Sequence, residues 1–524
     1  MLFRSPSFWV TEALRFTGCL VVMLLPATLL GMGFPLVLRM GGRTLSRLGS
    51  EVGALYLFNS MGCIVGSLLA GFLLVPRLGS ELTLRIAAAF SILLGLLVPR
   101  LLGRRAGNRP QLRLALLALA SIVIGLLVLP GWDKRSLTSG ANVLGLARGS
   151  DEALLFYHED GVGGVTSVVS SGGTKTLLTN GKFQGNDAEE MAAQKQFAIA
   201  PMLFVRNLDR ALVIGLGTGV TAHTVASAPF EAVDIAEIAP GIVEAARKFF
   251  PHVNGRVLED PRVTTHLADG RNFLLLSTES YDLITIELSN IWFAGAANLY
   301  SRDFYALCRS RLQPRGVLQQ WLQLHHIDTV DFISVLKTMR DVFPHMALFV
   351  GGGQGILIGS AEPLAIDYGI QARLRADPRF RHALLGSGLV AGEALAMLND
   401  LYLFEDNLTA LAEMDKAARV SSDAYPFLEY STPRGNQLPY SILANHKLIE
   451  VRRFRGLPPI LAIPGDKAEY FRGLLALGQG RLPDAVRHLE ASRQMGNGEP
   501  VCGLLLAEAR RRLAGAPPAG ADGS

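Results

Sequence analysis

Three glycines at alternate positions directly after an apolar run are the strongest chemical signal in the chain. Gly215, Gly217 and Gly219 follow the strand-like residues 211–214 and precede a segment that predicts a helix. Glycine lets the backbone turn tightly and lets a ligand approach where a Cβ would otherwise stand. The N-terminus of the following helix adds partial positive charge. The GxGxG spacing differs from the GxGxxG of dinucleotide-binding folds and favours an adenosyl cofactor.

Two acidic residues follow the glycine loop at the ends of the next two predicted strands. Residues 232–238 carry Glu237 near their end, and residues 263–267 are followed by Asp269 and Gly270. The carboxyl ends of parallel strands meet at one edge of an open α/β sheet, where ligands bind. The Glu237 carboxylate can accept hydrogen bonds from both ribose hydroxyls of a nucleoside. The Asp269 carboxylate can accept one from the adenine amino group. Each acid alone could be a helix N-cap, but their order after the loop predicts a nucleoside pocket.

Polar residues also follow the fourth predicted strand, where the reacting end of a bound cofactor is expected. Residues 281–286 lead into Glu287, Asn290 and Trp292. Glu287 can act as a general base or hold an amine, whereas Asn290 can orient an amine but cannot take its proton. Trp292 can supply an apolar or cation–π wall. A structural alternative, in which Ser289 and Asn290 cap the following turn, stays open.

The elements that must position these residues indicate a multidomain chain of 524 residues. Strands and helices alternate over residues 201–365, which predicts a mostly parallel, Rossmann-like α/β sheet. Residues 151–200 predict a small β element of short strands. Residues 366–460 are mixed and mainly helical, and residues 461–514 contain helical runs spaced like a tetratricopeptide (TPR) pair. Residues 515–524 are rich in Pro, Gly and Ala and predict a disordered tail.

Apolar stretches dominate the beginning of the chain and predict about four transmembrane helices within residues 1–131. Residues 16–38 hold no charged side chain and are long enough to cross about 30 Å of hydrocarbon. Residues 52–75 are similar, and residues 86–98 and 114–129 are shorter. Because these spans carry no ionisable residue near their middle, the bundle is interpreted as an anchor and not a pump.

The composition argues against several other classes of protein. The formal charge is +5, but many arginines lie between the apolar runs, so membrane-flanking charge explains the basic character better than nucleic-acid binding. Four widely spaced cysteines form no CxxC pair and give no support for a disulfide framework or a zinc site. His325 and His326 are expected on a strand, where adjacent imidazoles point to opposite faces, so no metal site is predicted.

The expected location is a multi-pass integral membrane protein of the cell membrane. Loop arginines by themselves favour an outward-facing soluble domain. Adenosyl cofactors are expected in the cytosol, however, and we therefore predict that the soluble domain is cytoplasmic.

Several short motifs between residues 157 and 360 together resemble a known family. They are LTNGKFQ at 178–184, VIGLGTG at 213–219, DPRV at 260–263, DGRNF at 269–273, LYSRDFY at 299–305 and LQPRGV at 312–317. With these motifs the chain resembles the spermidine/spermine synthases, the polyamine aminopropyltransferases with a PABS-type domain. It is most similar to the subgroup that is fused behind membrane helices.

The resemblance implies a small β domain before a class I S-adenosylmethionine-binding sheet. It also implies transfer of an aminopropyl group from decarboxylated S-adenosylmethionine to an amine. Gln184 stands at the position of the family's glutamine before the core, and Thr218 replaces the family's acid in the glycine loop. The donor-binding residues that the resemblance implies are Gln184, Gly215, Gly217, Thr218, Gly219, Glu237, Asp269 and Gly270.

The acceptor side departs from the family pattern. The family has Asp-Ser-x-Asp-Pro after the fourth strand, where residues 287–291 here read Glu-Leu-Ser-Asn-Ile. Residues 194–196 read Gln-Lys-Gln in place of Tyr-(His/Gln)-Glu, and Lys195 is expected to repel a dication. A pocket for a dication needs several carboxylates, so the polyamine interpretation is weakened while the adenosyl interpretation is not. Glu287 and Asn290 remain the catalytic candidates, with Trp292 and His158 as substrate-binding candidates.

The leading hypothesis is a membrane-anchored, spermidine synthase-like transferase that uses decarboxylated S-adenosylmethionine or S-adenosylmethionine as donor, without a metal. One alternative is an S-adenosylmethionine-dependent methyltransferase. Another is a non-catalytic membrane scaffold that keeps a vestigial nucleoside pocket. The expected partners are an amine acceptor, the lipid bilayer, a protein bound by the C-terminal helical repeat, and a second copy of the chain in a homodimer, but no nucleic acid.

Overall fold

The computed structural model divides into two compact units. It describes residues 8–41, 48–101, 116–117, 119–121, 124–125, 130–141, 152–160, 164–287, 291, 295–389, 393–435 and 441–515. The first unit comprises Met1–Ser167 and Leu178–Lys182, and the second comprises Val168–Leu177 and Phe183–Ser524. The glycine loop and the three acidic residues that follow it in the chain therefore belong to the second unit.

Long apolar helices make up most of the first unit. They are α1 (Phe8–Gly41), α2 (Leu48–Leu69), the π-helical turn η2 (Ala70–Leu74) and α3 (Val75–Leu101). Two continuous helical stretches, Glu12–Arg39 and Gly49–Gly95, are long and apolar enough to cross a membrane. The predicted spans 16–38, 52–75 and 86–98 all lie on these helices. The fourth predicted span, 114–129, falls largely outside the described residues.

A kink interrupts α3 near its start. Gly79 has a φ of 79° inside the helix, a backbone conformation that glycine adopts readily. The next backbone N–H, that of Ser80, donates to the Glu159 carboxylate at 2.6 Å. Glu159 lies on strand β1 (Ala153–Asp160) in the same unit. The carboxylate thus satisfies a backbone donor that the kink leaves without a helical partner.

The predicted β element contains four strands. They are β1, β2 (Gly164–Ser171), β3 (Thr174–Thr179) and β4 (Lys182–Asn186), which form a sheet in chain order. The strand β4 was not identified from the sequence. Asn180 and Gly181, which connect β3 to β4, both have positive φ angles, of 52° and 75°. An Asn-Gly pair between two strands is the usual signal for a tight hairpin.

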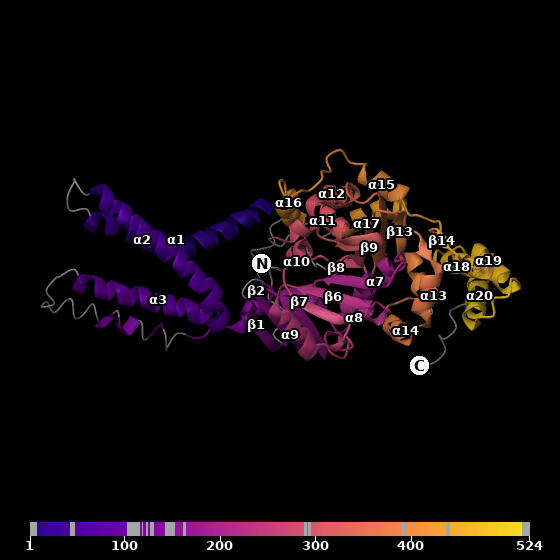
Figure 1. Ribbon diagram of the computed structural model, residues 1–524, viewed down its shortest axis with the longest axis horizontal. Helices are drawn as coiled ribbons and strands as arrows, with labels where there is room; N and C mark the ends of the chain where they lie inside the picture. Colours follow the sequence, from indigo (N-terminus) through magenta and orange to yellow (C-terminus); the bar gives the residue numbers. More distant parts are fainter. Residues whose placement is uncertain are drawn as a thin grey trace. The chain divides into compact units, whose positions relative to one another are not determined.

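An eight-stranded sheet forms the centre of the second unit, with helices on both faces (Figure 1). Its strands are β5 (Arg210–Ile214), β6 (Ala232–Glu237), β7 (Val263–Leu267), β8 (Tyr281–Ile286), β9 (Leu312–Leu322), β10 (His345–Gly351), β11 (Gln354–Ser360) and β13 (Leu401–Phe404). The order is β13-β10-β11-β9-β8-β5-β6-β7. The Rossmann-like α/β fold is therefore confirmed.

The sheet is mixed, which corrects the expectation of a mostly parallel one. Strands β9, β8, β5, β6 and β7 pair in parallel, whereas β11, β10 and β13 add antiparallel pairings. The cause lies between β10 and β11, where Gly352 and Gly353 have φ angles of 57° and 76°. Two residues with positive φ make a tight hairpin, and a hairpin can join only antiparallel strands.

The helices that cover the sheet differ in how deeply they are buried. They are α7 (Met191–Met202), α8 (Val220–Ser227), α9 (Pro240–Phe249), α10 (Gly270–Leu276), α11 (Arg302–Arg311) and α12 (Thr329–Arg340). Helix α7 is buried along nearly its whole length and packs against β8, β9 and α8. All six residues of β8 are buried as well, as expected for a strand covered on both faces.

Helices also dominate the C-terminal part of the second unit. The segment after β11 contains α13 (Tyr368–Ala376), α14 (Pro378–Leu384), the 3-10 helix η7 (Ala394–Asp400), α15 (Asp406–Ala412), α16 (Phe427–Gly435) and α17 (Ser441–Val451). The chain then continues into α18 (Gly465–Gly478), α19 (Leu482–Gln494) and α20 (Pro500–Leu513), drawn in yellow in Figure 1. A C-terminal helical region is therefore confirmed. Its likeness to a TPR pair stays a prediction, as do the finer domain boundaries.

Close packing of α18 on α19 predicts the effect of one glycine substitution. A Cβ on Gly473 would lie 2.6 Å from Leu489 Cγ and 3.1 Å from the Leu489 backbone nitrogen, whereas a Cβ on Gly503 of α20 would meet nothing within 4 Å. Both glycines are helical, so alanine should gain about 1 kcal/mol of helix propensity at either site. We expect Gly503→Ala to be neutral or stabilising and Gly473→Ala to destabilise by about 1–3 kcal/mol. Denaturant unfolding of the two variants measures the difference, and equal midpoints would contradict the packing.

Candidate functional site

The glycine loop connects β5 to α8 at the carboxyl edge of the central sheet. Gly215, Gly217 and Gly219 have φ angles of 90°, 54° and 89°, which side chains with a Cβ rarely adopt. A Cβ on Gly215 would also lie 2.8 Å from the carbonyl oxygen of Glu287. Glycine at this position is therefore required both by the backbone angle and by the close approach of β8.

Glu237 holds the glycine loop against the end of β6. Its side chain is buried, and one carboxylate oxygen accepts the Leu216 N–H at 2.8 Å while the other accepts the Ala239 N–H at 2.9 Å. Hydrogen bonds to an ionised carboxylate are stronger than neutral ones. The structure thus brings together two of the groups that the sequence analysis selected. That Glu237 binds ribose hydroxyls stays a prediction.

Asp269 and Gly270 begin α10, directly after β7. The Asp269 carboxylate accepts the Asn272 N–H at 2.8 Å, so the residue caps this helix. A Cβ on Gly270 would lie 2.3 Å from Ile214 Cγ2, so α10 can approach the end of β5 only because residue 270 is glycine. The capping role that was considered as an alternative is therefore present. Its contact with adenine stays a prediction.

Glu287 follows β8 and lies beside the same loop. Its backbone N–H donates to the Ile214 carbonyl at 3.0 Å, and the Cβ position of Gly217 is 3.9 Å from Glu287 Oε1. Within the described residues, Glu287 Oε2 is buried and has no hydrogen-bond partner. Burial raises the pKa of Glu287 to about 8, with the Thr221 hydroxyl acting in the opposite direction and the negative charge of Glu237 raising it further. The loop is thus bordered by two neighbouring carboxyl groups, one of which is protonated at neutral pH.

Gln194, Thr221 and Asn254, which the sequence analysis did not assign to the site, support the loop through hydrogen bonds. The Thr218 hydroxyl donates to Gln194 Oε1 at 2.7 Å, and the Thr221 hydroxyl donates to the Gln194 carbonyl at 2.8 Å. The Asn254 amide donates to the Thr218 carbonyl at 3.0 Å. The Gln184 carbonyl oxygen is 3.9 Å from the Cβ position of Gly217. Helix α7, strand β4 and residue 254 therefore all contact the glycine loop.

Gln319 on β9 is a further buried polar residue near the end of β8. Its Oε1 accepts hydrogen bonds from the Thr285 hydroxyl and, at 3.2 Å, from the Ile286 N–H. Its Nε2 is buried and has no partner among the described residues. Thr285 and Glu287 lie on the same face of β8 because side chains alternate along a strand. The signal in the sequence is a pair of glutamines, Gln319 and Gln320, inside an otherwise apolar strand.

Lys195 on α7 makes a hydrogen bond with the segment that follows α14. Its ammonium group donates to the Leu385 carbonyl, and its side chain is almost completely buried. Burial lowers the pKa of Lys195. The neighbouring Gln196 donates from Nε2 to the Ser387 carbonyl at 2.9 Å. Both side chains therefore bind the segment after α14, and repulsion of a cationic acceptor by Lys195 stays a prediction.

The structure does not test the remaining acceptor-side predictions. Asn290 and Trp292 lie outside the described residues. His158 belongs to the first unit, where its Nε2 is 3.6 Å from Asp160 and its ring stacks on Phe156. The proposed roles of all three residues stay predictions.

The adjacent histidines require a correction. His325 and His326 follow β9 in a bend and not in a strand, and their ring centroids are 5.4 Å apart. Across the described part of the chain, no group of three or more His, Cys, Asp or Glu side chains could hold a metal ion.

Comparison with known proteins finds similarity in the part of the chain that contains the described site. A family model for the spermine/spermidine synthase domain matches residues 190–351. A polyamine aminopropyltransferase of Nitrosomonas europaea is 32% identical over 170 residues, which cover 32% of this chain and 52% of the relative. Polyamine aminopropyltransferase 2 of Aquifex aeolicus is 22% identical over 344 residues, which cover 64% of this chain and 67% of the relative. The chain thus spans about half the length of the first relative.

Among solved structures, spermidine synthase from Thermotoga maritima overlaps with a TM-score of 0.37 at 19% identity, over 43% of this chain and 78% of that chain. Similarity to the membrane-fused subgroup stays a prediction. The segment matched by the family model, residues 190–351, begins one residue before α7 and ends with β10. It therefore contains the glycine loop, Glu237, Asp269 and Glu287. Residues 190–351 therefore match the spermine/spermidine synthase domain, and the chain is similar over part of its length to polyamine aminopropyltransferases.

Proposed function

We propose that this chain is a membrane-anchored, spermidine synthase-like transferase that moves an aminopropyl group from decarboxylated S-adenosylmethionine to an amine. The observation that carries the proposal is the buried Glu237 carboxylate bonded to the glycine loop, with Glu287 beside the same loop. The glycine loop lets a nucleoside approach the backbone closely, and the two neighbouring carboxyl groups favour a ligand that carries positive charge.

The donor would bind along the carboxyl edge of strands β5, β6 and β7. Its adenosine would lie against the glycine loop, with ribose hydroxyls at Glu237 and the adenine amino group at Asp269. Its sulfonium group would then lie near Glu287. A nearby positive charge favours the ionised carboxylate, so donor binding would lower the raised pKa of Glu287 and release a proton.

The transfer step needs positioning and one proton acceptor. The acceptor nitrogen attacks the first carbon of the aminopropyl group, and a carbon–nitrogen bond forms as the carbon–sulfur bond breaks. The electron pair of the broken bond stays on sulfur, which gives methylthioadenosine as the leaving product. The ionised Glu287 carboxylate takes the proton that the nitrogen loses. Alignment of nitrogen, carbon and sulfur in a site that excludes water supplies most of the rate.

The apolar helices would serve as the membrane anchor. Two stretches, Glu12–Arg39 and Gly49–Gly95, meet the length and composition needed to cross a bilayer. We propose a multi-pass anchor in the cell membrane that includes residues 114–129, with the second unit in the cytoplasm, where an adenosyl donor is expected.

Membrane extraction tests the anchor. The chain should stay in the membrane pellet after an alkaline carbonate wash and dissolve only in detergent, because a spanning helix is held by its hydrophobic length. Protease added to inverted vesicles should digest the second unit, while protease added to intact spheroplasts should not. Release of the chain by carbonate would contradict the anchor, and the reverse digestion pattern would contradict the orientation.

Product analysis with a pH series tests the transferase. Purified chain, decarboxylated S-adenosylmethionine and putrescine or another diamine should yield methylthioadenosine. Since the base must lose its proton, kcat/KM should rise with pH through about 8. The kcat profile should rise at lower pH, because the bound sulfonium favours ionised Glu287. Glu287→Gln should reduce the rate by about 10²–10⁴, whereas the exposed control Glu231→Gln should not.

Absence of methylthioadenosine with every diamine tested would argue against this function. A methyl-group product from S-adenosylmethionine would instead identify a methyltransferase, and failure to bind either donor would identify a scaffold.

The role of Glu237 can be measured without turnover. In Glu237→Gln the amide nitrogen replaces one carboxylate oxygen and meets a backbone N–H, so one of the two hydrogen bonds is lost. We expect calorimetry to show donor binding weakened at least about tenfold, equivalent to about 1.4 kcal/mol. The control Glu231→Gln changes an exposed residue directly before β6 and should keep the wild-type affinity. Unchanged binding by Glu237→Gln would show that the carboxylate only shapes the loop.

A further inference from the structure

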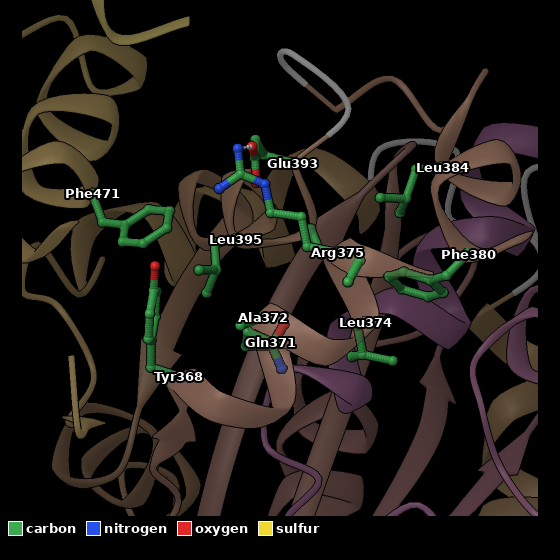
Figure 2. Close-up of a pocket in the computed structure, with 12 residues that line it drawn as sticks. Tyr368, Gln371, Ala372, Leu374, Arg375, Phe380, Leu384, Glu393, Leu395 and Phe471 are labelled. Carbon is green, nitrogen blue, oxygen red and sulfur yellow. Dashed lines mark ion pairs between the residues drawn. The ribbon is translucent and has the colours of Figure 1, made fainter. Parts of the chain in front are cut away.

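A cavity lies in the C-terminal part of the second unit, among α13, α14, η7 and α18. Its volume is about 300 Å³, which is at the lower end for small-molecule sites. Figure 2 shows Tyr368 and Phe471 on one side of it and Leu374, Phe380 and Leu384 on the other, with Leu395 between them. Most of the wall is therefore apolar or aromatic, which suits a ligand with an apolar body.

An ion pair provides the charge in this cavity. Glu393 Oε1 is 2.9 Å from Arg375 Nη2, and both residues contribute to the wall (Figure 2). The same guanidinium is already bound at both terminal nitrogens by the Glu499 carboxylate, at 3.1 and 2.8 Å. Two carboxylates therefore share one guanidinium, and Glu499 makes the better contact with it.

The neighbouring charges do not balance this arrangement. Lys467 Nζ is 2.5 Å from Glu499 and 3.8 Å from Asp466. Among the described residues, the cluster thus contains three carboxylates and two cations. Glu393 is the most buried of the three carboxylates, at 8% exposure. Burial raises the pKa of Glu393, with Arg375 acting in the opposite direction and Glu499 raising it further. Glu393 is therefore the carboxylate of this cluster that lines the cavity, and it shares its guanidinium partner with Glu499.

We propose that this cavity binds a small organic monocation, an amine carried on an apolar or aromatic body. The ammonium group pairs with Glu393, and the body packs against the apolar wall beside Tyr368 and Phe471. A buried carboxylate without a full counter-charge is costly, and an ammonium removes that cost. The aromatic rings add a face that attracts cations. The site is separate from the glycine loop and does not depend on the proposed transferase activity.

The same charges disfavour the other obvious ligand classes. A ligand with a carboxylate would be the third acidic group at Arg375, which already pairs with the carboxylates of Glu499 and Glu393. A diamine such as putrescine would place its second ammonium against Leu374 and Phe380, where the described part of the wall offers no carboxylate. Burying that charge without a partner costs more than the first pairing gains.

Calorimetry on the full chain in detergent tests whether binding requires a single positive charge. Four small probes that differ in charge are compared. They are 2-phenylethylamine, 2-phenylethanol, 3-phenylpropionate and putrescine. We expect 2-phenylethylamine to bind at least tenfold more tightly than each of the other three. Equal binding of the amine and the alcohol, or tighter binding of the acid or of putrescine, would overturn the proposal.

Two variants locate the binding. Glu393→Gln keeps the shape of the side chain and should abolish the preference for the amine over the alcohol. The matched control Glu413→Gln removes an exposed carboxylate of the same unit and should leave the preference unchanged. Ala372→Phe should fill the cavity and weaken the binding of the amine at least tenfold. This variant should fold, because Ala372 is an exposed helical position. Full amine binding by Ala372→Phe would overturn the proposal even if Glu393→Gln failed to fold.

Discussion

The hydrogen bonds from Leu216 and Ala239 to the Glu237 carboxylate are the contact on which the rest of the site depends. The glycine loop must present its backbone to a ligand, and glycine is the residue with the largest conformational freedom to lose. A charged acceptor beneath the loop offsets part of that loss and satisfies N–H groups that would otherwise be buried without partners. The loop is therefore fixed before any ligand arrives.

Glu287 adds a second carboxyl group to a site that already holds an ionised one. Its raised pKa means that the unliganded site avoids two neighbouring negative charges. A cationic ligand would reverse this balance, since it would stabilise both ionised groups. The same buried region thus favours positive charge in the ligand and provides a base once that ligand is bound. On β9, the buried amide nitrogen of Gln319 adds a further polar group near this region.

The C-terminal segment contributes to the site through α7. Lys195 and Gln196 bind the carbonyls of Leu385 and Ser387, and Gln194 on the same helix binds the hydroxyl of Thr218 in the glycine loop. Residues almost two hundred positions apart therefore fix one helix that supports the loop. The proposed amine cavity is lined by α14 of this same segment. A ligand bound there would contact the part of the chain that holds α7.

Local sequence determined strands β5 to β8, the glycine loop and the acids at the strand ends, because apolar runs and glycine spacing are short-range signals. It also indicated the apolar helices before residue 101. It did not reveal that Lys195 is buried against Leu385, that Gln194 and Asn254 support the loop, or that the sheet becomes antiparallel beyond β9. Those features are decided by contacts between residues far apart in the chain, and by burial. The pKa of Glu287 belongs with them, because only the folded surroundings remove water from its carboxylate.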